Sequence, residues 1–328
     1  MDIDQIITAQ HGIIARRQLR RVGVGDAALE WRLDRGVWRR VLRGVYTVTT
    51  GPLTRSAQFE AALLAAGGDG ALSHQSAAEE WGFDEWLVPR ESRIHVTRPV
   101  GKSSRRRGGS VVQSVGAPLG PVHLEGSELH PGVVLHRSKA LPHTVVGAEQ
   151  PRITRADTVI DLAAAEPSAR AAFAMTLRLG SSRAVRLDDL RSRLERRTPW
   201  RYRRAIDDAV NTLASGVDSV LEAEFVLRVE RPFGLPAPTR QVPVIVDGVV
   251  RYEDLIYERP GGRLIVRLDG KRFHLAHETR FRDRRRDNAA ELEGDHRLIY
   301  GWEDVTGGPG GVAEEILTIL ARIDSVAA

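Results

Sequence analysis

The sequence contains no cysteine and no apolar run long enough to cross a membrane. Without cysteine there is no disulfide and no thiolate zinc site, which fits the cytoplasm. A membrane helix needs about 20 consecutive apolar residues. A signal peptide needs a basic start, whereas this chain begins with the acidic stretch MDIDQIITAQ. We therefore expect a cytoplasmic protein that has no membrane partner.

Lysine is also scarce, since Lys102, Lys139 and Lys271 are the only lysines among 48 Lys and Arg residues. Arginine binds phosphate and guanine edges through paired hydrogen bonds, so its excess favours a nucleic-acid partner. The net charge of +5 suits a polyanion as well. A GC-rich coding sequence would also replace lysine by arginine throughout, and composition alone leaves both explanations open.

The first 50 residues predict three short helices followed by a hairpin. Helical spacing covers residues 2–10 and 14–22, and a third helix follows Gly25-Asp26 and stops at Gly36. Residues 37–49, VWRRVLRGVYTVT, read as two strands. This is the order of a winged helix-turn-helix, whose third helix enters the major groove and whose wing meets phosphates. The predicted phosphate contacts are Arg39, Arg40 and Arg43. A protein-docking module is the alternative.

Two stretches give this region a resemblance to a known family. GVYTVT in the hairpin and LSHQSAAEEWGF at residues 72–83 resemble the N-terminal domain of AbiEi-type antitoxins, over roughly residues 3–85. The resemblance implies a winged helix that binds promoter DNA, and a nucleotidyltransferase-like toxin as a protein partner. Ser73 suits the N-cap of the second stretch. His74 beside it is interpreted as a structural histidine.

The middle of the chain, residues 51–214, predicts an α+β segment that ends in a helical connector. Short β-like runs occur at 94–96, 111–115 and 133–136, and a helix is expected at 154–165. Its acids Asp157 and Asp161 are interpreted as helix-surface residues. The loop at 102–109 contains Arg105, Arg106 and Arg107. The sequence leaves open whether this loop binds phosphate or is a solvated hairpin tip.

The last part, residues 215–328, is organised around a hairpin at 249–274 that carries two aspartates. Asp254 and Asp269 lie on strands whose apolar runs predict burial, and a buried carboxylate costs several kcal/mol unless it meets a cation, a metal or a proton. The two-residue strand period places Arg267 on the same face as Asp269, and Glu253 on the face opposite Asp254. The element order predicts a mixed sheet with helices on both sides.

Four ordered motifs in this part resemble the very-short-patch-repair (Vsr) endonuclease superfamily, of the PD-(D/E)XK restriction-endonuclease-like fold. They are Ser219-x-x-Glu222, Asp254, the stretch from Leu268 to His274, and the run from Arg280 to Asn288. The resemblance implies a Mg²⁺ ion that activates water at a scissile phosphate. By position, Asp254 and Asp269 would be the metal ligands, and Glu222 and His274 would assist. We further expect Arg280 and Arg286 to contact DNA.

One departure from this pattern bears on catalysis, because Arg267 stands where the uncharacterised relatives of this superfamily usually have Glu. Vsr enzymes themselves have no acid at this strand position, so the loss weakens the case for an active site without closing it. A guanidinium beside Asp254 and Asp269 could replace the divalent cation and disrupt the site. The sequence therefore predicts a multidomain α+β chain and leaves two functions open. One is a DNA-binding regulator of antitoxin type with a silent nuclease fold. The other is a Mg²⁺-dependent DNA endonuclease. The oligomeric state is not predicted.

Overall fold

Two compact units make up the chain in the computed structural model. One contains Met1–Ala165 and Arg193–Trp200, and the other contains Glu166–Ser192 and Arg201–Ala328. No helix among the residues that the structure describes is long and apolar enough to cross a membrane. The described residues are 2–100, 120–139, 145–147, 149–182, 184–197, 201–217, 219–246, 249–269 and 295–326.

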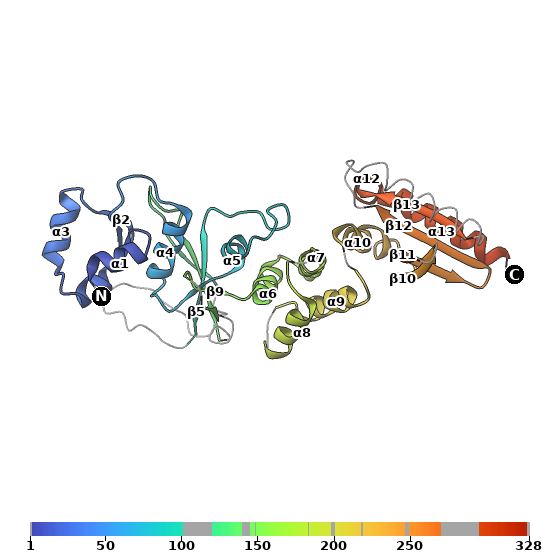
Figure 1. The fold of residues 1–328 in the computed structure, drawn as a ribbon, viewed down its shortest axis with the longest axis horizontal. Coiled ribbons are helices and arrows are strands. Elements are labelled where there is room, and N and C mark those ends of the chain that lie inside the picture. The colour runs from blue at the N-terminus through green and yellow to red at the C-terminus, as the bar shows by residue number, and fades with distance from the viewer. Residues whose placement is uncertain are drawn as a thin grey trace. The chain divides into compact units, whose positions relative to one another are not determined.

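The N-terminal segment contains three helices and a small antiparallel sheet in the order β1-β3-β2 (Figure 1). The predicted second helix is too long, because residues 13–15 form a strand paired with residues 45–47. All three strand residues are buried, and this tertiary pairing overrides the helical spacing. The other predicted elements are confirmed. The bounds are α1 Ile3–Ala9, β1 Ile13–Ala15, α2 Arg16–Arg21, α3 Asp26–Asp34, β2 Arg39–Leu42 and β3 Val45–Thr47.

Both faces of this small sheet are buried. One face packs against α1 to α3, with a core of Ile14, Leu19, Leu29, Trp38 and Tyr46. On the other face Ile13, Ala15 and Val45 join the core around Phe59 of α4 (Arg55–Ala65). The N-terminal segment is therefore continuous with the core of the sheet that follows.

That second sheet has six strands in the order β6-β7-β5-β4-β9-β8. Its α4 face carries Ile94, Val96 and Val133. The opposite face meets α5, where Ala71 of β4 packs against Ala77. The predicted strands near 94 and 133 and the helix from 154 are confirmed, and 111–115 lies outside the described residues. The bounds are β4 Ala71–Leu72, α5 His74–Trp81, β5 Ile94–Pro99, β6 Val122–Leu124, β7 Val133–Ser138, β8 Val145–Val146, β9 Arg152–Ile153 and α6 Arg155–Ala165.

The prediction of Asp157 as a helix-surface acid is wrong. Asp157 is fully buried on α6, where its carboxylate lies 3.2 Å from Arg197 and 3.4 Å from Arg193. The hydroxyl of Thr154 also donates to it over 2.5 Å. Two arginines and a hydroxyl therefore compensate the loss of hydration of this buried carboxylate.

The second unit begins with the expected helices, α7 Ala169–Ser181, α8 Leu187–Arg196 and α9 Arg203–Ala214, of which α8 ends in the residues assigned to the first unit. Phe173 and Leu177 of α7 pack with Leu213 of α9 and with Val226 of the π-helix η2 (Val226–Glu230). The predicted connector thus shares a core with the segment that follows residue 214. Ser219 caps α10 (Val220–Phe225) as expected, its hydroxyl accepting the Glu222 N–H over 3.2 Å.

A four-stranded sheet in the order β10-β11-β12-β13 forms the rest of this unit (Figure 1). The predicted hairpin is confirmed as β11 and β12, with Arg259 opposite Gly262 at the turn. One sheet face, with Leu255 and Val266, packs against α10 and α13. The motif run from Arg280 to Asn288 lies outside the described residues. The bounds are β10 Thr239–Val246, β11 Val249–Arg259, β12 Gly262–Asp269, β13 His296–Gly301, α12 Trp302–Gly307 and α13 Pro309–Val326.

Candidate functional site

The first candidate site is the arginine-rich surface of the N-terminal segment, which begins with α2, RRQLRR. Arg16 and Arg20 each pair with Asp26 at the start of α3, at 2.8 and 2.9 Å. The hydrogen bonds from Arg20 and Arg16 lower the pKa of Asp26. Arg17 donates to the carbonyl of Leu64 on α4 over 2.6 Å. These three arginines therefore anchor α2 to its neighbours.

The hairpin β2–β3 carries the three arginines that were predicted to meet phosphates. Arg39 donates to the carbonyl of Thr49 over 3.0 and 2.6 Å, and to that of Gly51. Its guanidinium thus fixes the backbone that leaves β3. Arg40 and Arg43 are exposed. The structure therefore leaves Arg40 and Arg43 presented to solvent and gives Arg39 a structural contact.

The surface of α3 is acidic. Its sequence DAALEWRLD contains three acids and one arginine, and only Leu29 is buried. Trp31 is 54% exposed, with the Arg35 guanidinium 5.1 Å from its ring. Asp26 is neutralised by the two arginines of α2, which leaves Glu30 and Asp34 on the surface. Phosphates near these acids would be repelled, so the surface of α3 suits a polyanion less well than the hairpin does.

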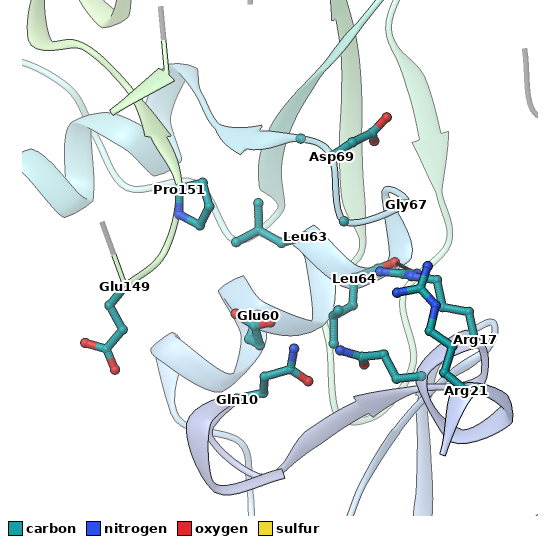
Figure 2. A pocket seen from close by; sticks show the side chains of 13 residues that line it. Gln10, Arg17, Arg21, Glu60, Leu63, Leu64, Gly67, Asp69, Glu149 and Pro151 are labelled. Carbon is teal, nitrogen blue, oxygen red and sulfur yellow. Dashed lines mark hydrogen bonds between the residues drawn. The ribbon is translucent and has the colours of Figure 1, made fainter. Parts of the chain in front are cut away.

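A pocket of about 390 Å³ lies between α2 and α4 (Figure 2). Its charged lining is mixed, with Arg17 and Arg21 near Asp69 on one side, and with Glu60 and Glu149 further along (Figure 2). Burial lowers the pKa of Arg17 and raises the pKa of Glu60. Two cations and three acids give this pocket no preference for an anion.

The second candidate site is the acidic hairpin of the C-terminal sheet. The β11–β12 ladder ends at the pair Leu255 and Val266, while β12 continues alongside β13 as far as Asp269. Just beyond the last pair, the Asp254 carboxylate accepts the Leu268 N–H over 2.8 Å. Asp254 therefore takes the place of a backbone acceptor where the two strands part.

Arg267 meets Glu253 in a buried bidentate ion pair. Both N···O distances are 2.6 Å, and the two residues are 8% and 2% exposed. The alternation of strand side chains had placed Glu253 opposite Asp254 and away from this site, and the observed contact corrects that prediction. The pairing of β11 with β12 ends at Leu255 and Val266. Beyond this pair the alternation of side chains between the two sheet faces no longer keeps Glu253 away from Arg267.

Glu222 is buried on α10. It lies close to β10, the strand that pairs with the β11 strand of Asp254. It accepts a hydrogen bond from the Ser219 hydroxyl over 2.9 Å, and the Gln241 amide lies 3.4 Å from each carboxylate oxygen. Gln241 lies on β10 between residues paired with Leu255 and Glu253, in a left-handed conformation at φ 50°. Such a φ is uncommon for a residue other than glycine and is often found at functional sites.

Of the remaining predicted site residues, Asp269 alone belongs to the part of the chain that the structure describes. Asp269 is exposed at the end of β12, opposite Gly301. The other predicted residues lie outside the described residues, namely Arg105, Arg106, Arg107, His274, Arg280 and Arg286. Gln241 and the pairing of Glu253 were missed in the sequence, which gives no signal for either.

Comparison with known proteins supports the N-terminal resemblance. Residues 1–49 match the family described as "Transcriptional regulator, AbiEi antitoxin". No curated protein matches the chain. The match supports a DNA-binding regulatory N-terminus of antitoxin type, and the Vsr resemblance of the C-terminal part stays a prediction.

Proposed function

We propose that this protein is a DNA-binding regulator of antitoxin type, with a winged helix-turn-helix in its first 50 residues. The family match over residues 1–49 supports this function. The order α1-β1-α2-α3-β2-β3, with the strands arranged β1-β3-β2, is the order expected for a winged helix. Besides DNA, this function implies a second partner, the toxin protein that an antitoxin counteracts.

The observation that carries the proposal is the exposure of Arg40 and Arg43 on the β2–β3 hairpin. In a winged helix this hairpin is the wing, and it lies along the DNA backbone. Arg39 fixes the strand end next to them. The acids Glu30 and Asp34 reduce the electrostatic affinity of α3. In this proposal the wing supplies most of the phosphate contacts.

For the C-terminal unit we propose a Vsr-like fold that does not cleave DNA. The support is Arg267, which stands at the position of the relatives' Glu and is held in place by Glu253. The alternative is a Mg²⁺-dependent endonuclease that uses Asp254 and Asp269. In its favour, the charge of Arg267 is balanced by Glu253, and Asp254 lies at a strand opening near the buried Glu222.

The proposed function is tested by duplex binding of the full chain at several salt concentrations. The double variant Arg40→Ala/Arg43→Ala should bind more weakly, and the slope of log K against log salt should fall by about 1.8, because each phosphate contact contributes about 0.9. The matched control Arg170→Ala/Arg322→Ala removes two exposed arginines from the other unit. If wild type and Arg40→Ala/Arg43→Ala bind duplex DNA with equal affinity and equal salt dependence, the β2–β3 hairpin does not contact the DNA.

A further inference from the structure

Three histidines gather on one face of the six-stranded sheet. His95 lies on β5 and His136 on β7, and His74 is the first residue of α5. In the β5–β7 register His95 is opposite Val134, and Thr97 is opposite His136. Both histidines therefore point to the face that α5 covers. None of the three was assigned a binding role from the sequence, because they come from three separate segments.

The three imidazoles are in direct contact. Nδ1 of His95 lies 2.9 Å from Nε2 of His136. The rings of His74 and His136 stack with centroids 3.8 Å apart. One nitrogen from each ring can be chosen so that all three lie within 4.8 Å of one another. Two nitrogen ligands at 2.0–2.1 Å from a tetrahedral ion are roughly 3.3 Å apart. The nitrogens of His95 and His136 are already close to this separation. The ring of His74, which is stacked face to face on His136, has to turn out of the stack to bring its lone pair to the same ion.

A neighbouring side chain fixes the tautomer of one of these rings. The Glu91 carboxylate accepts a hydrogen bond from His95 Nε2 over 2.8 Å. The lone pair of His95 then resides on Nδ1, the atom that faces His136. A carboxylate that holds the outer N–H of a histidine is the usual second shell of a metal ligand. The Ser73 hydroxyl lies 3.0 Å from His74 Nδ1, where it can donate or accept.

The backbone at this place is strained. His74 adopts a left-handed conformation at φ 48° where α5 begins. A left-handed φ is uncommon for a residue other than glycine, and such strain is concentrated at functional sites. The ring of this residue stacks on that of His136.

We propose that His74, His95 and His136 bind one transition-metal ion of the Zn²⁺ type. Three imidazoles select zinc, cobalt, nickel or copper over Mg²⁺ and Ca²⁺, which prefer oxygen ligands. The ion takes the lone pairs of His95 Nδ1, His74 Nε2 and His136 Nε2. The proton on His136 Nε2 moves to Nδ1 of the same ring, so binding releases no proton from this ring. His136 is partly exposed and provides the route by which the ion and a fourth ligand enter.

The test uses the full chain, stripped of metal and titrated with Co²⁺ and Zn²⁺. We expect one ion per chain, with the intense visible absorption of tetrahedral Co²⁺ that Zn²⁺ then abolishes. His136→Asn should lower the affinity by more than about 100-fold, and Glu91→Gln by roughly 10–100-fold, as for other second-shell partners. The matched control is His296→Asn, which removes an exposed histidine from the other unit.

A thermal melt separates loss of metal from loss of fold. Zn²⁺ should raise the melting temperature of wild type and of His296→Asn, and should leave that of His136→Asn unchanged, whereas Mg²⁺ should shift none of them. If His136→Asn does not fold, the Co²⁺ spectrum of wild type and the lower affinity of Glu91→Gln decide. The proposal is overturned if wild type gives no tetrahedral spectrum, or if His136→Asn and Glu91→Gln bind as wild type does. None of these readouts depends on DNA binding.

Discussion

Arg267 and Glu253 form a buried ion pair in which both carboxylate oxygens accept from the guanidinium over 2.6 Å. This contact changes the interpretation of the C-terminal site. From the sequence, Arg267 was expected to act on Asp254 and Asp269 as a substitute cation. Its guanidinium forms an ion pair with Glu253, a residue that alternation had placed on the other face. The ion pair therefore contributes both to the stability of the sheet and to the electrostatics beside Asp254.

Breaking this ion pair should destabilise the protein strongly. Arg267→Met leaves Glu253 as a buried carboxylate without its guanidinium, and removing one partner of such a pair costs about 3–5 kcal/mol. Glu253→Leu should cost a similar amount of stability, because it leaves the buried guanidinium of Arg267 without its carboxylate. Urea unfolding of each variant measures the change.

The double variant Glu253→Leu/Arg267→Met completes this experiment. Because it leaves no buried charge behind, its loss of stability should be well below the sum of the two single losses. If the two losses simply add, the residues are not coupled and the ion pair does not stabilise the sheet.

Arg39 should behave differently from its neighbours on the hairpin. Its guanidinium donates to the carbonyls of Thr49 and Gly51. Arg39→Ala should therefore lower stability by about 1 kcal/mol, because it removes the hydrogen bonds that hold the backbone after β3. Arg40→Ala, at an exposed position, should change stability by less than about 0.5 kcal/mol. Thermal unfolding distinguishes the two, and equal melting temperatures would contradict the structural role of Arg39.

Glu60 should make the stability of the N-terminal unit depend on pH. Burial raises its pKa, and the charges of His11 and Arg17 oppose this only in part. The folded state thus holds the proton more tightly than the unfolded state does. The resulting stability is fully present below the ordinary pKa of 4.5 and is lost as pH rises through the higher folded pKa.

Glu60→Gln removes this titration. Its stability relative to wild type should increase with pH, with a slope of at most about 1.4 kcal/mol per pH unit for one proton. Urea midpoints of the N-terminal unit from pH 4 upward provide the measurement. Glu30→Gln, at an exposed position of α3, is the control. A difference between Glu60→Gln and wild type that does not change with pH would contradict the prediction.

Local patterns were enough to predict part of this fold. The apolar runs on either side of Pro260-Gly261 predicted the β11–β12 hairpin, because strand patterning and turn residues agree there. The N-terminal order of helices and hairpin was predicted in the same way. The strand at 13–15 was not, because its pairing with 45–47 depends on a contact across 30 residues of chain.

The sites were harder to predict, since they depend on contacts distant in the sequence. Glu253 reaches Arg267 only where the strand ladder has ended. The burial of Asp157 depends on Arg197, 40 residues later. The histidine group combines residues from α5, β5 and β7. Residue type and spacing selected Asp254 and Glu222 as candidate site residues. They could not show which side chains surround these two acids.

The nuclease alternative leads to the last prediction. We expect no Mg²⁺- or Mn²⁺-dependent nicking of supercoiled plasmid by wild type, because Arg267 fills the position of the relatives' acid and is held there by Glu253. Asp254→Asn is the informative variant, since its amide oxygen can still accept the Leu268 N–H while the charge is removed. Glu314→Gln removes an exposed acid from α13 as a control. Nicking by wild type and Glu314→Gln that disappears in Asp254→Asn would establish the endonuclease instead of the silent fold.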